Sequence, residues 1–147
     1  YRYGRDMREQ GHGRILNISS VASMMAGPYM AMYFASKAFV RSLSEAVSHE
    51  LRDTGVSVTC VCPGPTSTGF AKAANMHGMN FFTLTKPATA YQLATYAYRK
   101  MKQGRTLAYH GYLTKAGAAA ERLLPRALTR RVAAIMNGGN PRNQHRK

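Results

Sequence analysis

Two side chains of this sequence have the types and the spacing for acid–base chemistry. Tyr33 and Lys37 lie four residues apart, a spacing that places both side chains on one face of a helix. An ammonium group held beside a phenol favours the phenolate, so the pair can exchange a proton with an alcohol. The same spacing is common in exposed helices, and the pair therefore defines a site only together with other groups.

One such group is a serine hydroxyl that follows a short predicted strand. Residues 14–18 (RILNI) form the strand, and Ser20 lies just past it, thirteen residues before Tyr33. Ligands of an open parallel sheet bind beyond the carboxyl ends of its strands. We therefore expect Ser20 to hold a substrate oxygen beside the Tyr33 phenol, whereas Ser19 satisfies backbone groups.

A second loop takes the same position one strand over. Residues 56–61 (VSVTCV) are a β-branched run, which is typical of a buried parallel strand. Glycine allows close backbone approach to a ligand, and threonine hydroxyls can bond a carboxamide or a phosphate. The candidate ligand contacts of this loop are Pro63, Gly64, Thr66 and Thr68.

The elements that must position these residues form a strand–helix–strand unit, which predicts an α/β fold with a parallel sheet and flanking helices. Its helix spans residues 33–51, and spacings of three and four predict one buried face. That face consists of Phe39, Val40, Leu43, Ala46, Val47 and Leu51. A helix from Pro87 to about Lys102, a strand at residues 105–110 and a basic amphipathic helix at 113–136, broken near Pro125, are predicted to follow.

The cysteines and histidines do not indicate a disulfide or a metal site. Cys60 and Cys62 lie in the second predicted strand, and we interpret them as reduced packing residues that point to opposite faces. The five histidines are scattered without ligand spacing. We therefore expect no metal.

The charge indicates an anionic partner. The chain has 21 Lys and Arg against 6 Asp and Glu, a formal net charge of +15. Nucleotide phosphates, acidic lipid headgroups and nucleic acid would all satisfy it. Nucleic acid is disfavoured because no base-reading motif accompanies the charge. Much of the excess lies in the last third of the chain, where residues 113–136 could bind an anionic membrane surface.

Taken together, the segments NISS (17–20), YFASK (33–37) and PGPTST (63–68) resemble the active-site half of the short-chain dehydrogenase/reductase family. The resemblance implies an oxidoreductase that interconverts a small carbonyl compound and an alcohol with NAD or NADP. Tyr33 would be the proton donor and acceptor, Lys37 would favour its ionised form and hold the nicotinamide ribose, and Ser20 would anchor the substrate oxygen. The loop with Gly64 would face the nicotinamide. Candidates for the substrate wall are Met25, Met30, Phe70, Met76 and Phe81.

The sequence departs from the family at its beginning. The glycine-rich dinucleotide loop is missing, because Gly11 and Gly13 precede a strand and Leu16 occupies the place of the third glycine. We therefore expect the C-terminal portion of a Rossmann-type fold, inactive alone, with its N-terminal dinucleotide-binding half missing. The expected division is a catalytic half at residues 1–112, a basic amphipathic extension at 113–136 and a disordered tail at 137–147.

Alternatives to the enzyme stay open at this point. The chain could be an inactive remnant that acts as a binding or membrane-associated protein, and it could form a homo-oligomer. A cytoplasmic location is expected, with peripheral membrane contact through the basic helix as the alternative.

Overall fold

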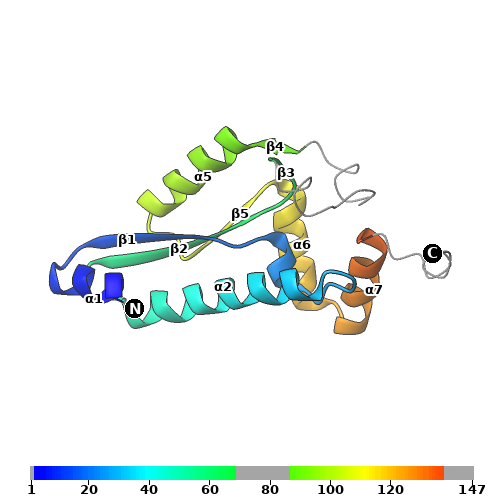
Figure 1. The fold of residues 1–147 in the computed structure, drawn as a ribbon, viewed down its shortest axis with the longest axis horizontal. Coiled ribbons are helices and arrows are strands. Elements are labelled where there is room, and N and C mark those ends of the chain that lie inside the picture. The colour runs from blue at the N-terminus through cyan, green and yellow to red at the C-terminus, as the bar shows by residue number, and fades with distance from the viewer. Residues whose placement is uncertain (1, 69–86, 138–147) are drawn as a thin grey trace.

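A parallel sheet with helices on both faces forms the body of the protein (Figure 1). The computed structural model describes residues 2–68 and 87–137. The three strands of this sheet, β1 (Gly13–Ile18), β2 (Val56–Pro63) and β5 (Leu107–His110), lie in the order β1-β2-β5. The predicted α/β class, and each of the three predicted strands, is confirmed.

The central strand β2 pairs in parallel with both neighbours. Its register runs from Gly13 opposite Val56 to Ile18 opposite Val61 on one side. On the other side, Cys60 lies opposite Leu107 and Pro63 opposite His110. The β-branched residues of β2 suit a strand that is covered on both faces, and Val58 and Val61 are almost completely buried.

Two small hydrophobic cores hold the helices to the sheet. Helices α1 (Arg2–Glu9) and α2 (Ala31–Glu50) cover one face, and α5 (Ala90–Lys102) covers the other (Figure 1). The first core contains Leu51, Val56 and Val58, with Met7, Ile15 and Val47 packed against it. The second contains Val61, Ala97 and Ala108, with Leu16, Leu93 and Tyr96 packed against it.

The predicted buried face of α2 is only partly correct. Leu51 is buried, and Val40 and Val47 are half-buried. Phe39 and Leu43, however, are 65% and 46% exposed, and Ala46 is exposed as well. The apolar stripe is wider than the part of the helix that touches the sheet, so the described structure buries one side of it and leaves the other open.

A small polar residue of α2, Ser44, is buried where the helix packs on the sheet. Ser44 is fully buried, donates to the Val40 carbonyl at 2.6 Å and accepts from the Asn17 amide at 2.9 Å. Cys60 and Cys62 are free, and both lie on this face of β2. The prediction that they point to opposite faces is wrong, because alternate residues of a strand share a face.

The helix boundaries follow from local capping. Pro87 does not begin α5; instead Thr89 caps it, accepting from the Gln92 backbone N–H while the Gln92 side chain accepts from Thr89 N. Residues Ala88–Thr89 (β4) pair with Thr66–Ser67 (β3) in a two-stranded sheet that the sequence did not predict. The basic segment forms α6 (Tyr112–Leu123) and α7 (Arg126–Met136), separated near Pro125 as predicted.

Candidate active site

Ser20 begins a short turn beyond the carboxyl end of β1. It caps the 3-10 helix η1 (Val21–Met24), and its hydroxyl accepts from Ala22 N at 3.1 Å. Its carbonyl accepts from the Ser23 hydroxyl at 2.7 Å. A serine hydroxyl has one donor and two acceptor positions, so this cap leaves the Ser20 proton available to a ligand.

Tyr33 and Lys37 lie on the first turns of α2, on the same side of the helix. The Lys37 ammonium nitrogen is 5.9 Å from the centre of the Tyr33 ring and donates to the Ile18 carbonyl at 3.1 Å. The second contact joins α2 to the end of β1. Helix and strand therefore hold the ammonium beside the phenol.

The loop after β2 brings the third group of predicted residues to the same edge of the sheet. Pro63 is the last residue of β2, and the Thr66 hydroxyl donates to the Gly64 carbonyl at 3.1 Å. A Cβ at Gly64 would collide with the Thr114 hydroxyl of α6. Glycine is therefore required where this loop passes close to the helix.

One cavity of about 480 Å³ brings all of these residues together. Its lining includes every predicted site residue, namely Ser20, Tyr33, Lys37, Pro63, Gly64, Thr66 and Thr68. Met25 and Met30 of the predicted substrate wall also line it. The other three candidates, Phe70, Met76 and Phe81, lie outside the described residues.

Sequence reasoning missed the opposite wall of this cavity, which α6 and α7 provide. This wall consists of Leu113, Thr114, Gly117, Ala120, Glu121, Leu124, Thr129, Val132, Ala133, Met136 and Asn137. The Asn137 amide donates to the Pro28 carbonyl at 2.9 Å and so ties the end of α7 to the loop before α2. The apolar stripe of residues 113–136 indicated a buried face, but the sequence did not show that this face lines the cavity.

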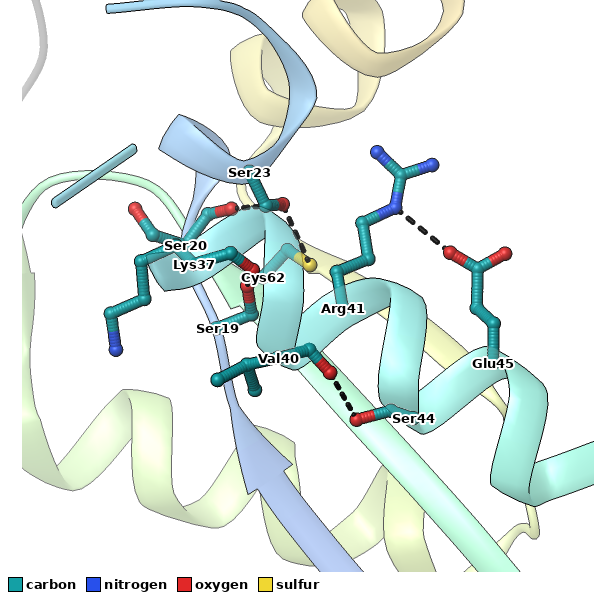
Figure 2. Close-up of polar contacts among 9 residues, drawn as sticks. All are labelled: Ser19, Ser20, Ser23, Lys37, Val40, Arg41, Ser44, Glu45 and Cys62. Carbon is teal, nitrogen blue, oxygen red and sulfur yellow. Dashed lines mark hydrogen bonds and ion pairs between the residues drawn. The ribbon is translucent and has the colours of Figure 1, made fainter. Parts of the chain in front are cut away.

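A layer of small polar side chains lies beside Ser20 and Lys37 (Figure 2). Ser19 is buried and donates to the Lys37 carbonyl at 2.7 Å, so its predicted structural role is confirmed. The Ser23 hydroxyl lies 3.8 Å from the Cys62 sulfur. Figure 2 shows Lys37 projecting away from the Arg41–Glu45 ion pair, whose atoms are 3.0 Å apart. The layer therefore fixes the backbone around Ser20 and Lys37.

The two thiols of this layer have opposite ionisation tendencies. A hydrogen bond from Cys60 lowers the pKa of Cys62 to about 7, with help from Ser23 and Arg41 and against burial. The same hydrogen bond, followed by burial, raises the pKa of Cys60. Both side chains are completely buried, so we assign them to packing.

The described residues show neither a metal-binding cluster nor a membrane-crossing helix. No group of three or more His, Cys, Asp or Glu side chains within residues 2–68 and 87–137 could hold a metal ion. In the same ranges, every helix is too short or too polar to cross a bilayer.

Comparisons with known proteins point to one family. A family model described as short chain dehydrogenase matches residues 3–78. A 3-oxoacyl-[acyl-carrier-protein] reductase of Synechocystis sp. is 44% identical over 69 residues, which are 47% of this chain and 28% of that protein.

Solved structures match over most of the chain. A short-chain dehydrogenase from Sphingobium yanoikuyae in complex with NADPH is 25% identical with a TM-score of 0.65, covering 82% of this chain and 47% of that one. A 7beta-hydroxysteroid dehydrogenase is 24% identical with a TM-score of 0.74, covering 90% and 52%. The chain thus spans about half the length of the solved structures that it matches.

Proposed function

Because this chain belongs to the short-chain dehydrogenase family, we propose that it supplies the proton-transfer half of an NAD(P)-dependent reaction between a carbonyl compound and an alcohol. One observation carries the proposal. The predicted hydroxyl, phenol and ammonium groups line a single cavity at the carboxyl end of the parallel strands, the edge at which open α/β sheets bind ligands.

Each polar group has a role that its contacts support. Ser20 donates its free proton to the substrate oxygen, since its cap uses only an acceptor position. Tyr33 gives a proton to that oxygen, or takes one from it, depending on the direction of the reaction. Lys37 uses one of its three donors on the Ile18 carbonyl, which leaves two for the phenol and for ribose hydroxyls.

The loop after β2 fits the nicotinamide end of the cofactor. Gly64 has no side chain at a point that a Cβ would fill. Pro63, Thr66 and Thr68 line the cavity beside it, and threonine hydroxyls can bond a carboxamide. When bound, NAD or NADP supplies or accepts the hydride. These residues would orient the ring.

We further propose that the chain is the C-terminal, catalytic half of a longer Rossmann-type domain. Three observations support this. The chain spans about half of its solved relatives, the outer edge of β1 has no partner strand within the described residues, and Phe39 and Leu43 of α2 are exposed. An unpaired strand edge and open apolar faces are normally covered in a native protein. The chain alone is then inactive.

Tyr33→Phe in the full-length protein tests the chemistry. Removing a general acid–base group should lower kcat by about 10²- to 10⁴-fold, followed as NAD(P)H absorbance. The matched control is Tyr29→Phe, because Tyr29 is 54% exposed and does not line the cavity; it should keep full activity. Retained turnover in Tyr33→Phe would exclude the proposed role.

A second function, binding to an anionic membrane surface, is favoured by one observation on α7. This helix exposes Leu128 and Ile135 beside Arg130 and Arg131, the combination found in helices that lie in a membrane interface. Co-sedimentation with phosphatidylglycerol vesicles, but not with phosphatidylcholine vesicles, is expected. Binding that survives Arg130→Gln together with Arg131→Gln would count against this function.

A further inference from the structure

Two charged side chains line the cavity: Lys37 beside the sheet and Glu121 on the opposite wall, which α6 and α7 provide. We propose that the cavity takes a neutral, lipophilic ketone or secondary alcohol, and that Glu121 excludes carboxylates and phosphate esters from the opposite wall. This inference rests on the proposed function, because Ser20 and Tyr33 place the reacting oxygen.

The polar groups of the cavity concentrate at the sheet. Ser20 follows the carboxyl end of β1, Tyr33 and Lys37 lie at the start of α2, and Thr66 lies in β3, just after β2. The opposite wall is mainly apolar, formed by Leu113, Leu124, Val132, Ala133 and Met136. A bound substrate would therefore hold its oxygen at the sheet and its apolar body against α6 and α7.

Two of the four polar side chains on the opposite wall, Thr129 and Asn137, donate hydrogen bonds within the protein. The Thr129 hydroxyl donates to the Arg126 carbonyl at 3.1 Å, and the Asn137 amide donates to the Pro28 carbonyl at 2.9 Å. A ligand oxygen near them would lose its hydrogen bonds to water, and these two donor bonds would not replace them because they are made to protein carbonyls. An apolar body does not incur that cost.

The charged residues of the lining disfavour an anionic group on the opposite wall. Lys37 and Glu121 are the charged residues among the described lining, and Lys37 already donates to Ile18 beside Tyr33. Glu121 is half-buried and makes no ion pair within the described ranges. The α7 arginines Arg126, Arg130 and Arg131 are exposed and do not line the cavity. A carboxylate on the opposite wall would therefore meet the like charge of Glu121.

The negative charge of Glu121 in the cavity is opposite in sign to the net charge of the chain. A net charge of +15 attracts anions to the surface, yet the wall that would contact the substrate body presents an acid. Repulsion against the wrong ligand is a common source of specificity. Glu121 is thus a specificity-determining residue rather than a catalytic one.

Binding of two probes to the full-length protein tests the proposal. The first is methyl nonyl ketone. The second is the oxo acid that has a carboxylate in place of the methyl group at the far end of the nonyl chain. Equilibrium dialysis should show the ketone binding at least about tenfold more tightly than the oxo acid. Equal affinity of the two probes in the wild-type protein would overturn the proposal.

Variants then assign the discrimination to Glu121. Glu121→Gln should strengthen binding of the oxo acid by about tenfold and leave the ketone unchanged, whereas Glu50→Gln, an exposed acid outside the cavity, should change neither. Discrimination that persists unchanged in a folded Glu121→Gln protein would overturn the role of this residue.

A substitution in the wall itself gives an independent test that requires no turnover. Val132→Glu, on the cavity side of α7 and 43% exposed, should weaken ketone binding about tenfold because it places a charge against the apolar body. Unchanged ketone binding would contradict the assigned wall. Active Tyr33→Phe, by contrast, would overturn the proposed proton transfer while leaving these binding results intact.

Discussion

The two ends of the parallel sheet use the same kinds of residues for different purposes. At the amino end, tight turns bring backbone against backbone: Gly55 has φ of 76°, and a Cβ there would collide with the Gly11 carbonyl. At the carboxyl end, the chain leaves β1 and β2 through serines, threonines and Gly64, which surround a cavity. At the amino end the turns pack backbone against backbone, whereas at the carboxyl end the loops surround the cavity that contains the candidate site residues.

This difference shows where substitutions should affect stability and where they should affect ligand binding. The turns at the amino end contain none of the candidate site residues, so changes there should act mainly on the free energy of unfolding. Residues at the carboxyl end are held by a second layer of contacts, such as Ser19 to Lys37, and keep donors for a ligand. Four predictions test this division, in order of decreasing effect.

The largest effect is expected for Gly55→Ala at the amino end. The left-handed backbone costs an alanine about 1–2 kcal/mol, and the collision with Gly11 should add a further cost of about 1–3 kcal/mol. Urea unfolding would measure the loss. Gly104→Ala is the matched control, because Gly104 also has positive φ, 64°, but nothing lies near its Cβ position; it should show only the first cost. Equal losses in the two variants would argue against the backbone collision.

Gly64→Ala should have a smaller effect on stability but should also change the site. Its Cβ would displace the buried Thr114 hydroxyl, at a cost of about 1–3 kcal/mol, and would shift a wall of the cavity. Both the free energy of unfolding and cofactor affinity in the full-length protein should fall. Adding Thr114→Ala should restore much of the stability, since it removes the atom in the way. A double variant no better than the single one would exclude this contact as the cause.

Thr59→Val should stabilise the protein by about 1 kcal/mol without affecting either end. Thr59 lies in the middle of β2, is completely buried, and its hydroxyl has no hydrogen-bond partner in the described structure. An unsatisfied buried hydroxyl costs about 1–3 kcal/mol, and valine has nearly the same shape. Chemical denaturation would measure the gain. A loss of stability would mean that the hydroxyl has a partner, such as an internal water.

The smallest effect should come from protonation of His110 at the carboxyl end. Burial, followed by the nearby Lys115, lowers the pKa of His110 below its ordinary 6.5. The unfolded chain then binds a proton more readily, so stability is retained above about pH 6.5 and decreases as the pH falls through the folded-state value. Unfolding measured between pH 7 and 5 should show a shallower decrease for His110→Gln, and an unchanged slope would contradict the assignment. His12→Gln at the exposed amino-end turn serves as the control.

Short-range patterns were sufficient to predict the sheet and the positions of Ser20, Tyr33 and Lys37 on its elements. The β-branched run of β2 identifies the central strand, and the four-residue spacing of Tyr33 and Lys37 fixes their relation once the helix forms. Ser20 follows from the end of β1. These features depend on neighbours in sequence, or on the general geometry of a βαβ unit.

Features that depend on distant partners could not be predicted. Which half of the α2 stripe is buried depends on what lies against the helix, and Phe39 and Val40 are equally apolar in sequence. The β3–β4 pair joins residues 66–67 to residues 88–89 and contains too few residues for a pattern. The placement of α7 over the cavity depends on tertiary contacts, including the one made by Asn137.

The hydrogen bond from Asn137 to Pro28 also has a consequence for synthesis on the ribosome. The two residues are 109 positions apart, and chains grow at about 5–20 residues per second. For several seconds, therefore, the nascent chain contains Tyr33 and Lys37 but lacks the segment that anchors the preceding loop and covers the cavity. A chain that terminated before α7 would therefore leave Tyr33 and Lys37 without the wall that this helix provides.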